Sequence, residues 1–329
     1  MFGYHKSMMG KLLSNKFVIQ GVWVAVVALV TLLAIFASNR FFQSDFWGGI
    51  KEDGSASPEW ELSLKEGAME FSLPTDAFLS VFVKENGYEK ILAEKNKDAQ
   101  YPIASITKLV TALVASEQYE GDDIIMLTAN ALKERGASGV YPPGSRLLFN
   151  DALRALLIAS HNEVASALAE QAGVGGFVEA MNQRAQAIGL QNTVFFNAIG
   201  VDPLVDSKQI NLSTALDIYK LARYIQESFP DILSITVQNE YSLSDAGGKF
   251  ITTIQNTNKL LEWEEAPFQI LGGKTGDTPR AKKNLVVVSG SPCGGKIFSV
   301  VLGSQDNFED MKALLLYIND SYKWSCPID

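Results

Sequence analysis

The pattern of apolar and polar positions divides the chain into strand segments towards both ends and helical segments between them. Two extended stretches within 79–92 flank Asn86-Gly87, a strong short-range signal for a hairpin turn. Apolar residues at helical spacing predict helices over 105–114, 151–159, 162–172, 176–189, 213–227 and 308–322. Later strands are predicted over 268–274, 284–290 and 296–303. Strands from distant parts of the chain with helices inserted between them predict an α+β domain.

A long uncharged segment, residues 17–37, precedes these elements. At helical rise it is long enough to cross the hydrocarbon core of a bilayer. Lysines precede it and acidic residues follow it, a bias that places the N-terminus in the cytoplasm. Bulky residues stand where a signal peptidase needs small ones, which favours a retained signal anchor over a cleaved signal peptide. The predicted organisation is a cytoplasmic N-terminus over 1–16, a transmembrane anchor over 17–38, a juxtamembrane linker over 39–75 and one extracytoplasmic domain over 76–329.

Composition narrows the classes of partner. The formal net charge is -9, and no Lys/Arg-rich run or cluster with zinc-ligand spacing occurs. Because nucleic-acid binding needs a concentrated basic patch, we expect no nucleic-acid partner. The two cysteines, Cys293 and Cys326, both fall on the predicted exported side, where they could form a disulfide or remain unpaired thiols.

The first candidate for chemistry is the pair Ser105 and Lys108. Three residues separate them, so on a helix the two side chains lie on the same face. Burial lowers the pKa of a lysine, and a neutral amine can take a proton from a neighbouring hydroxyl. By itself, Ser-x-x-Lys is a weak pattern. A capping serine followed by a solvated lysine would give the same letters.

Two further motifs follow in the chain. Ser160-His161-Asn162 lies between two predicted helices, where the hydroxyl and the amide could face a cleft or could cap the second helix. Lys274-Thr275-Gly276 ends a strand bordered by glycines, which let another backbone approach closely. A cation beside a hydroxyl suits the binding of a carboxylate. The alternative is an exposed edge strand with a protective lysine.

Taken together, Ser-x-x-Lys, Ser-x-Asn and Lys-Thr-Gly in this order are typical of penicillin-binding proteins and class A β-lactamases. The chain resembles the low-molecular-mass D-alanyl-D-alanine carboxypeptidases, which are serine DD-peptidases, from about residue 79 to about 303. The segments 181–202 and 256–261 are also similar to this family.

The resemblance implies a DD-peptidase/β-lactamase-like α+β fold, in which helices flank an antiparallel sheet and a helical subdomain is inserted. It implies that Ser105 is acylated, that Lys108 is its base, and that Ser160 relays a proton to the leaving amine. Asn162 would hold Lys108 and the substrate backbone. The remaining implied substrate-binding residues are Lys274, Thr275, Gly276, Asp277 and Thr278. The backbone N–H groups of residues 105 and 277 would form the oxyanion hole.

The implied reaction removes the terminal D-alanine from peptidoglycan stem peptides through an acyl-enzyme, without metal or cofactor. β-Lactams would acylate the same serine. With the predicted anchor, the enzyme would sit in the cell membrane with its catalytic domain outside the cytoplasm.

Two departures from the family pattern stand out. His161 occupies a position that is usually glycine, and we expect its side chain to point to solvent rather than to narrow the cleft or to impose a pH dependence near neutrality. After Thr278 the family usually continues with Ala-Gly, whereas this chain continues with residues 279–283, Pro-Arg-Ala-Lys-Lys.

Three alternatives remain. A class A-like β-lactamase would need a Glu-x-x-Leu-Asn segment that residues 192–202 do not provide. A DD-endopeptidase would use the same motifs as the carboxypeptidase. A non-catalytic peptidoglycan-binding protein would be expected to have lost one of them.

Overall fold

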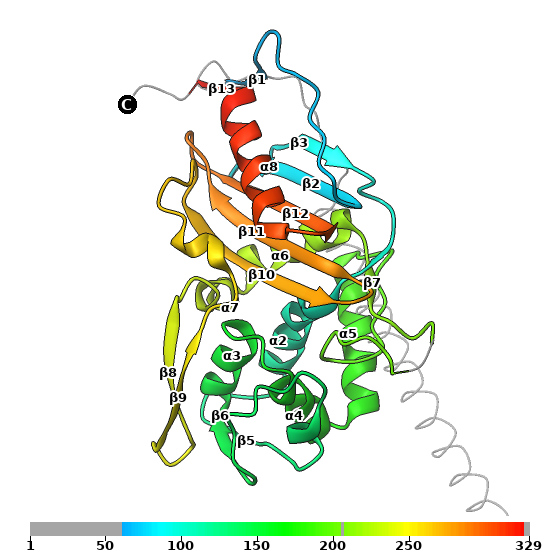
Figure 1. Cartoon of the computed structure of the whole chain (residues 1–329), viewed down its shortest axis with the longest axis vertical. Coiled ribbons are helices and arrows are strands. Elements are labelled where there is room, and N and C mark those ends of the chain that lie inside the picture. The colour runs from blue at the N-terminus through cyan, green and yellow to red at the C-terminus, as the bar shows by residue number, and fades with distance from the viewer. Residues whose placement is uncertain (1–60, 205–206, 326–329) are drawn as a thin grey trace, which may run out of the picture. The chain divides into compact units, whose positions relative to one another are not determined.

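The computed structural model describes residues 61–204 and 207–325. Its centre is a five-stranded antiparallel sheet in the order β10-β11-β12-β2-β3, built from both ends of the described chain (Figure 1). The strands are β2 (Ala77–Val83), β3 (Glu89–Lys95), β10 (Ile270–Thr278), β11 (Lys282–Gly290) and β12 (Lys296–Ser304). The predicted hairpin forms between β2 and β3, with Gly87 at φ +85° in its turn.

Helices cover both faces of this sheet. Helix α8 (Asn307–Ser321) lies on one face and α6 (Ala215–Ser228) on the other (Figure 1). All seven residues of β2 are buried, which explains why this strand reads as an almost continuous apolar run rather than an alternating one.

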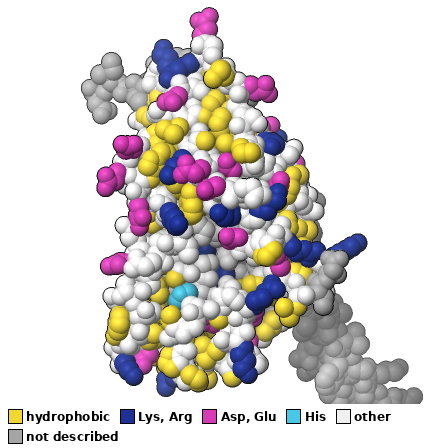
Figure 2. All heavy atoms as spheres, in the orientation of Figure 1, with side chains coloured by type: hydrophobic (Ala, Val, Ile, Leu, Met, Phe, Trp, Pro, Cys, Tyr) yellow, Lys and Arg dark blue, Asp and Glu magenta, His cyan; other side chains and the backbone are white. Residues whose placement is uncertain are grey.

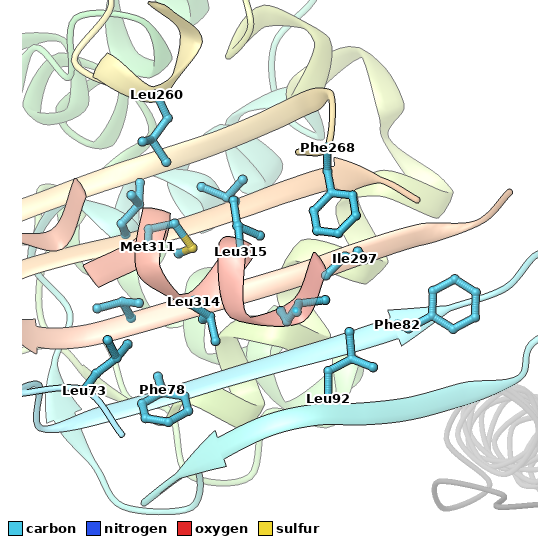
Figure 3. Close-up of a cluster of buried hydrophobic side chains, with 14 of the residues drawn as sticks. Leu73, Phe78, Phe82, Leu92, Leu260, Phe268, Ile297, Met311, Leu314 and Leu315 are labelled. Atoms are coloured by element: carbon cyan, nitrogen blue, oxygen red, sulfur yellow. The ribbon is translucent and has the colours of Figure 1, made fainter. Parts of the chain in front are cut away.

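The main core fills the space between α8 and the sheet. Figure 3 shows Met311, Leu314 and Leu315 of α8 in one cluster with Phe78 of β2 and Ile297 of β12. These side chains are all at most 1 % exposed. Burial of this apolar surface fixes β10 in place through its neighbours, and β10 carries the third sequence motif.

A helical block is inserted between β3 and β10, as the sequence predicts (Figure 1). Its longer helices are α2 (Lys108–Ser116), α3 (Phe149–Leu157), α4 (Asn162–Ala172) and α5 (Val174–Ile188). Between α2 and α3 the chain forms two short paired strands, β5 (Ile124–Met126) and β6 (Arg146–Leu148), and the turn η2 (Ala131–Lys133).

Helix α6 begins at Ala215, two residues after the start of the predicted range 213–227. Thr214 caps it: the Thr214 hydroxyl accepts a hydrogen bond of 3.0 Å from the Asp217 N–H. The Ser213 hydroxyl instead lies 2.8 Å from that of Thr193.

The small two-stranded sheets were not predicted, and two of them extend the fold. Strands β8 (Glu240–Ser244) and β9 (Phe250–Gln255) form a hairpin beside α3, after the short helix α7 (Pro230–Ile235). Strand β1 (Glu61–Leu64) pairs with β13 (Tyr322–Ser325), and Leu62 and Leu73 join the main core. The folded unit therefore includes residues that precede the predicted domain boundary at 76.

The remaining short elements include those that carry or flank the first and third sequence motifs. They are β4 (Tyr101–Pro102), which pairs with β7 (Leu212–Ser213), and the turns η1 (Ala104–Thr107) and η3 (Lys259–Glu262). Across residues 61–204 and 207–325, none of the helices combines the length and the apolar character needed to cross a bilayer. The anchor predicted over 17–38 lies outside the described residues.

Candidate active site

The sequence predicts Ser105 on an α-helix, but it lies on the single 3-10 turn η1 immediately before α2. The side chains of Ser105 and Lys108 still meet, because residues three apart are also stacked in a 3-10 turn. The turn has a strained entry, since Ala104 adopts φ +48°. Gly200, at φ +87°, fits against it; a Cβ there would come within 2.0 Å of the Ala104 carbonyl oxygen. Only glycine can therefore occupy position 200 beside this turn.

Lys108 begins α2 and is completely buried. Its Nζ lies 2.9 Å from the Ser105 Oγ, 2.7 Å from the Asn162 Oδ1 and 2.8 Å from the Ile199 carbonyl oxygen. Burial, followed by the neighbouring charge of Lys274, holds the pKa of Lys108 well below its usual range.

The hydrogen-bonding capacity of the neutral Lys108 amine determines which neighbour faces its lone pair. A neutral amine has two N–H donors and one lone pair. The Asn162 Oδ1 and the Ile199 carbonyl oxygen can only accept, so they take the two N–H groups. The Ser105 hydroxyl is the one neighbour of the three that can donate, and the lone pair is left for its proton. This arrangement is set for deprotonating Ser105.

Ser160 lies on the connection between α3 and α4, and Asn162 is the first residue of α4. Neither side chain caps the helix, which begins without a side-chain capping bond. Ser160 adopts φ +60°, an uncommon conformation for a non-glycine residue. The Asn162 Nδ2 donates to the Arg135 carbonyl oxygen at 2.8 Å while its Oδ1 accepts from Lys108. Asn162 thereby ties Lys108 to the segment after η2.

Lys274 of β10 enters the same cluster from the sheet. Its side chain is 1 % exposed, so it is not the exposed protective lysine of the alternative interpretation. The Nζ donates to the Ser160 Oγ and to the Thr275 carbonyl oxygen, both at 2.9 Å. Burial lowers the pKa of Lys274 to about 7. The Thr275 hydroxyl lies 2.7 Å from that of Thr257.

The next residues of β10 run alongside the Ser105 turn. A Cβ on Gly276 would lie 2.8 Å from the Ile103 carbonyl oxygen and 3.2 Å from the Ser105 amide nitrogen, so the strand backbone is in close contact with the turn. The exposed Asp277 follows. The Thr278 hydroxyl donates to Asp202 Oδ1 at 2.8 Å. All three predicted motifs therefore converge on one site.

His161 is buried, and the prediction that it points to solvent is wrong. It is 8 % exposed, and its Nδ1 lies 2.7 Å from the Tyr141 hydroxyl. Burial lowers the pKa of His161 and raises that of Tyr141, so the phenol keeps its proton and shares this hydrogen bond with the neutral ring. The sequence could not show this, because Tyr141 lies on an irregular segment 20 residues away.

Several residues of the site were missed from the sequence. Ile199 contributes only a backbone carbonyl, and any side chain could stand there. Asp202 is buried, accepts from Thr278, and also accepts the Arg280 N–H at 3.0 Å. Its carbonyl oxygen accepts from the Arg135 guanidinium. Asp202 lies in the 181–202 segment that resembles the family, and this was the one available signal.

The site is hollowed and cationic. Figure 2 shows Lys and Arg atoms recessed in the middle of this face. In the part of the chain that the structure describes, no group of three or more His, Cys, Asp or Glu residues could hold a metal ion. Cys293 is disulfide-bonded; Cys326 lies outside the described residues.

Comparison with known proteins agrees with this geometry. The model of the D-alanyl-D-alanine carboxypeptidase family, peptidase S11, matches residues 74–306. The chain is 29% identical to a D-alanyl-D-alanine endopeptidase of Haemophilus influenzae, over 68% of this chain and 74% of that one. It is 28% identical to the D-alanyl-D-alanine carboxypeptidase DacC of Escherichia coli, over 69% of this chain and 58% of that one.

Among solved structures, penicillin-binding protein D2 of Listeria monocytogenes in its ampicillin-bound form superposes with a TM-score of 0.65 and 26% identity. The match covers 77% of this chain and all of that one. The fold is therefore the mixed helix and sheet fold of DD-peptidases. The chain belongs to the D-alanyl-D-alanine carboxypeptidase family of serine peptidases.

Proposed function

We propose that this protein is a serine D-Ala-D-Ala carboxypeptidase in which Ser105 is the nucleophile and Lys108 the base. One observation carries the assignment of roles: the buried Lys108 amine has two neighbours that only accept hydrogen bonds and one hydroxyl that can donate. Membership of the family establishes the class of enzyme, a hydrolase that acts on D-Ala-D-Ala.

The reaction begins when Lys108 Nζ takes the Ser105 hydroxyl proton and Oγ attacks the carbonyl carbon of the penultimate D-alanine. The backbone N–H groups of Ser105 and Asp277 stabilise the oxyanion; the close contact of Gly276 with the Ser105 turn supports this pairing. The C–N bond then breaks, and the terminal D-alanine leaves with a proton on its amine. Water hydrolyses the Ser105 ester and regenerates the hydroxyl.

Ser160 is placed to deliver the proton to the leaving amine. Its Oγ accepts from Lys274, so its own hydroxyl proton is free to point into the cleft. Asn162 holds Lys108 and is positioned to contact the substrate backbone. Lys274 supplies charge for the terminal carboxylate, while Thr275 supplies a hydroxyl. Thr278 supports substrate binding indirectly, since its hydroxyl donates a hydrogen bond to Asp202.

The S11 peptidases act in the cell envelope. How this chain is placed relative to the membrane is part of the proposal. Residues 1–16 are cytoplasmic, 17–38 anchor the chain in the membrane, and the linker that follows is shorter than the predicted 39–75, because β1 and Leu73 already belong to the catalytic domain that faces peptidoglycan. β-Lactams are expected to acylate Ser105, as the ampicillin-bound neighbour supports.

Labelling with fluorescent penicillin tests the assignment of roles. The wild-type chain should label covalently, whereas Ser105→Ala should not, and Lys108→Met should label at least about 10³-fold more slowly. Ser116→Ala, at the other end of α2, is the matched control and should label normally.

Substrate assays separate the alternatives. The wild-type enzyme should release free D-alanine from a pentapeptide. Sustained nitrocefin hydrolysis would show a β-lactamase instead. Absence of labelling together with binding to isolated peptidoglycan would show a non-catalytic binding protein.

A further inference from the structure

Glu163 is a buried acidic residue beside the active site to which the proposed mechanism gives no role. It is the second residue of α4, directly after Asn162, and it is 0 % exposed. Its Oε1 accepts from the Ser138 N–H at 2.9 Å and from the Ser138 hydroxyl. Its Oε2 is also buried and, within the described residues, has no hydrogen-bond partner. A carboxylate buried with one oxygen unpaired costs free energy, so its placement calls for a reason.

Stabilisation of the helix does not account for this burial. A negative charge in the first turn of α4 does interact favourably with the helix dipole. A carboxylate directed at solvent would give the same benefit without the cost of desolvation. Glu163 is instead turned towards Ser138, on the irregular segment that follows η2. The side chain therefore has a role inside the domain.

The contact with Ser138 fixes the wall on which Asn162 depends. Ser138 lies three residues after Arg135, whose carbonyl oxygen accepts from the Asn162 Nδ2 at 2.8 Å. Because the amide of Asn162 is held at its Nδ2, its Oδ1 stays directed at the Lys108 Nζ, 2.7 Å away. Two neighbouring residues of α4 thus bind one segment, and through this segment Glu163 fixes the partner of the base.

The charge of Glu163 also acts on Lys108. Burial and the charge of Lys274 lower the pKa of Lys108, whereas the charges of Glu163 and Glu134 raise it. Glu134 is partly exposed, so water screens its charge, while the buried Glu163 acts through dry protein. Without this opposing charge the amine would be a weaker base for the Ser105 hydroxyl.

A second titratable pair lies in the same corner. The Nδ1 of His161, the residue before Asn162, lies 2.7 Å from the Tyr141 hydroxyl. Burial lowers the pKa of His161, the charge of Glu163 raises it, and that of Lys108 lowers it. Burial and the charge of Glu163 raise the pKa of Tyr141, which keeps its proton. A pH profile of the enzyme can therefore contain His161 as well as Lys108.

We propose that Glu163 is a positioning residue for the catalytic base: its carboxylate fixes the segment that orients Asn162 and places a buried negative charge near Lys108. The inference rests on the role proposed above for Lys108. No bond to Glu163 forms or breaks in the reaction. It acts through Asn162 and through its charge.

The test measures the rate of Ser105 acylation by fluorescent penicillin as a function of pH, on the full chain purified in detergent. Glu163→Gln removes the charge and keeps a carbonyl oxygen for the Ser138 N–H, whereas Glu163→Ala removes both. The matched control is Glu170→Gln, since Glu170 lies on the same helix and also accepts from a hydroxyl, that of Thr128.

Glu163→Gln should move the acid limb of the profile to lower pH by about one unit, because the Lys108 amine then loses its proton more readily. The maximal rate should fall about threefold, since a weaker base takes the serine proton less well. The basic limb, where Lys274 loses its charge, should stay in place. Glu170→Gln should leave the maximal rate and both limbs unchanged.

Glu163→Ala tests the contact with Ser138. Its maximal rate should fall about tenfold further than that of Glu163→Gln, because Asn162 loses its fixed orientation. Hydrogen exchange of the Ser138 amide should be faster in Glu163→Ala than in Glu163→Gln. Equal exchange in the two variants would show that the carboxylate does not hold this segment and would overturn that part of the inference.

The same comparison in a His161→Gln background separates the two titrating groups. The shift caused by Glu163→Gln should persist there, because the acid limb belongs to Lys108. A shift that disappears with the imidazole would assign the limb to His161 and overturn the inference.

An unchanged profile, or a uniform loss of rate with both limbs in place, would also overturn the inference, because a merely structural residue moves no limb. A wild-type chain that does not label at all would instead overturn the proposed function. If Glu163→Ala shows no cooperative urea transition, it has not folded, and the pH profile of Glu163→Gln decides the outcome.

Discussion

Replacing Lys274 by Met should change how the stability of the protein depends on pH. Burial lowers the pKa of this lysine from 10.5 to about 7 in the folded state. In the unfolded chain it keeps its ordinary pKa and stays protonated up to about pH 10.5. Between these two values the unfolded state binds one more proton than the folded state. The free energy of unfolding must therefore rise with pH across this window and fall as the solution is acidified.

The size of the effect follows from the linkage relation. Each pH unit at full difference in proton binding is worth about 1.4 kcal/mol. At pH 7 the folded lysine is half protonated, so the rise between pH 7 and pH 9 amounts to about 2 kcal/mol from Lys274 alone. Because the side chain is 1 % exposed, solvent screening takes little away from this figure.

Urea denaturation of the wild-type chain and Lys274→Met at pH 7, 8 and 9 measures this contribution. The difference in unfolding free energy between the two proteins should shift by about 2 kcal/mol over this range, with the wild type gaining on the variant as the pH rises. Lys259→Met, at an exposed lysine, should show no such shift. A difference between wild type and Lys274→Met that is independent of pH would refute the burial of the Lys274 amine described above.

Two further predictions concern single contacts. Gly276→Ala places a Cβ 2.8 Å from the Ile103 carbonyl oxygen, so β10 must move away from the Ser105 turn. The rate of acylation by fluorescent penicillin should then fall about 10²-fold with little change in the thermal midpoint. An unchanged rate would show that the oxyanion site does not depend on this contact. Tyr141→Phe leaves the buried His161 Nδ1 without its hydrogen-bond partner and should lower the free energy of unfolding, measured in urea, by about 1–3 kcal/mol; no loss would place the imidazole in contact with water.

The elements that the sequence predicts well are those with a long, clear period. Helix α4 begins and ends where the apolar spacing predicts, and the central sheet follows from its apolar runs and the Asn86-Gly87 turn. The β8–β9 hairpin was missed although its strands alternate around a Gly247-Gly248 turn. Its outer positions are polar and its strands are short, so the pattern differs little from that of a loop.

The residues of the site also fall into those that the sequence can reveal and those that it cannot. Side chains that must be one residue type for chemistry, such as Ser105 and Lys108, can be found from their spacing. Contacts made by the backbone cannot, because the Ile199 carbonyl oxygen that accepts from Lys108 is 91 residues away and does not depend on the side chain at that position. The burial of His161 also depends on tertiary packing, here on an irregular segment that brings Tyr141 over the ring.

The two buried lysines give the site a way to respond to its substrate. At neutral pH the Lys274 amine, with its pKa near 7, is about half protonated, whereas burial and the charge of Lys274 hold the pKa of Lys108 well below its usual range. A substrate carboxylate beside Lys274 favours the charged form and draws a proton onto that amine. The charge of Lys274 in turn disfavours protonation of Lys108. Under the roles proposed above for these two lysines, binding of the substrate's terminal carboxylate and readiness of the base are coupled, because the proton that steadies the substrate at Lys274 keeps a second proton away from the Lys108 lone pair.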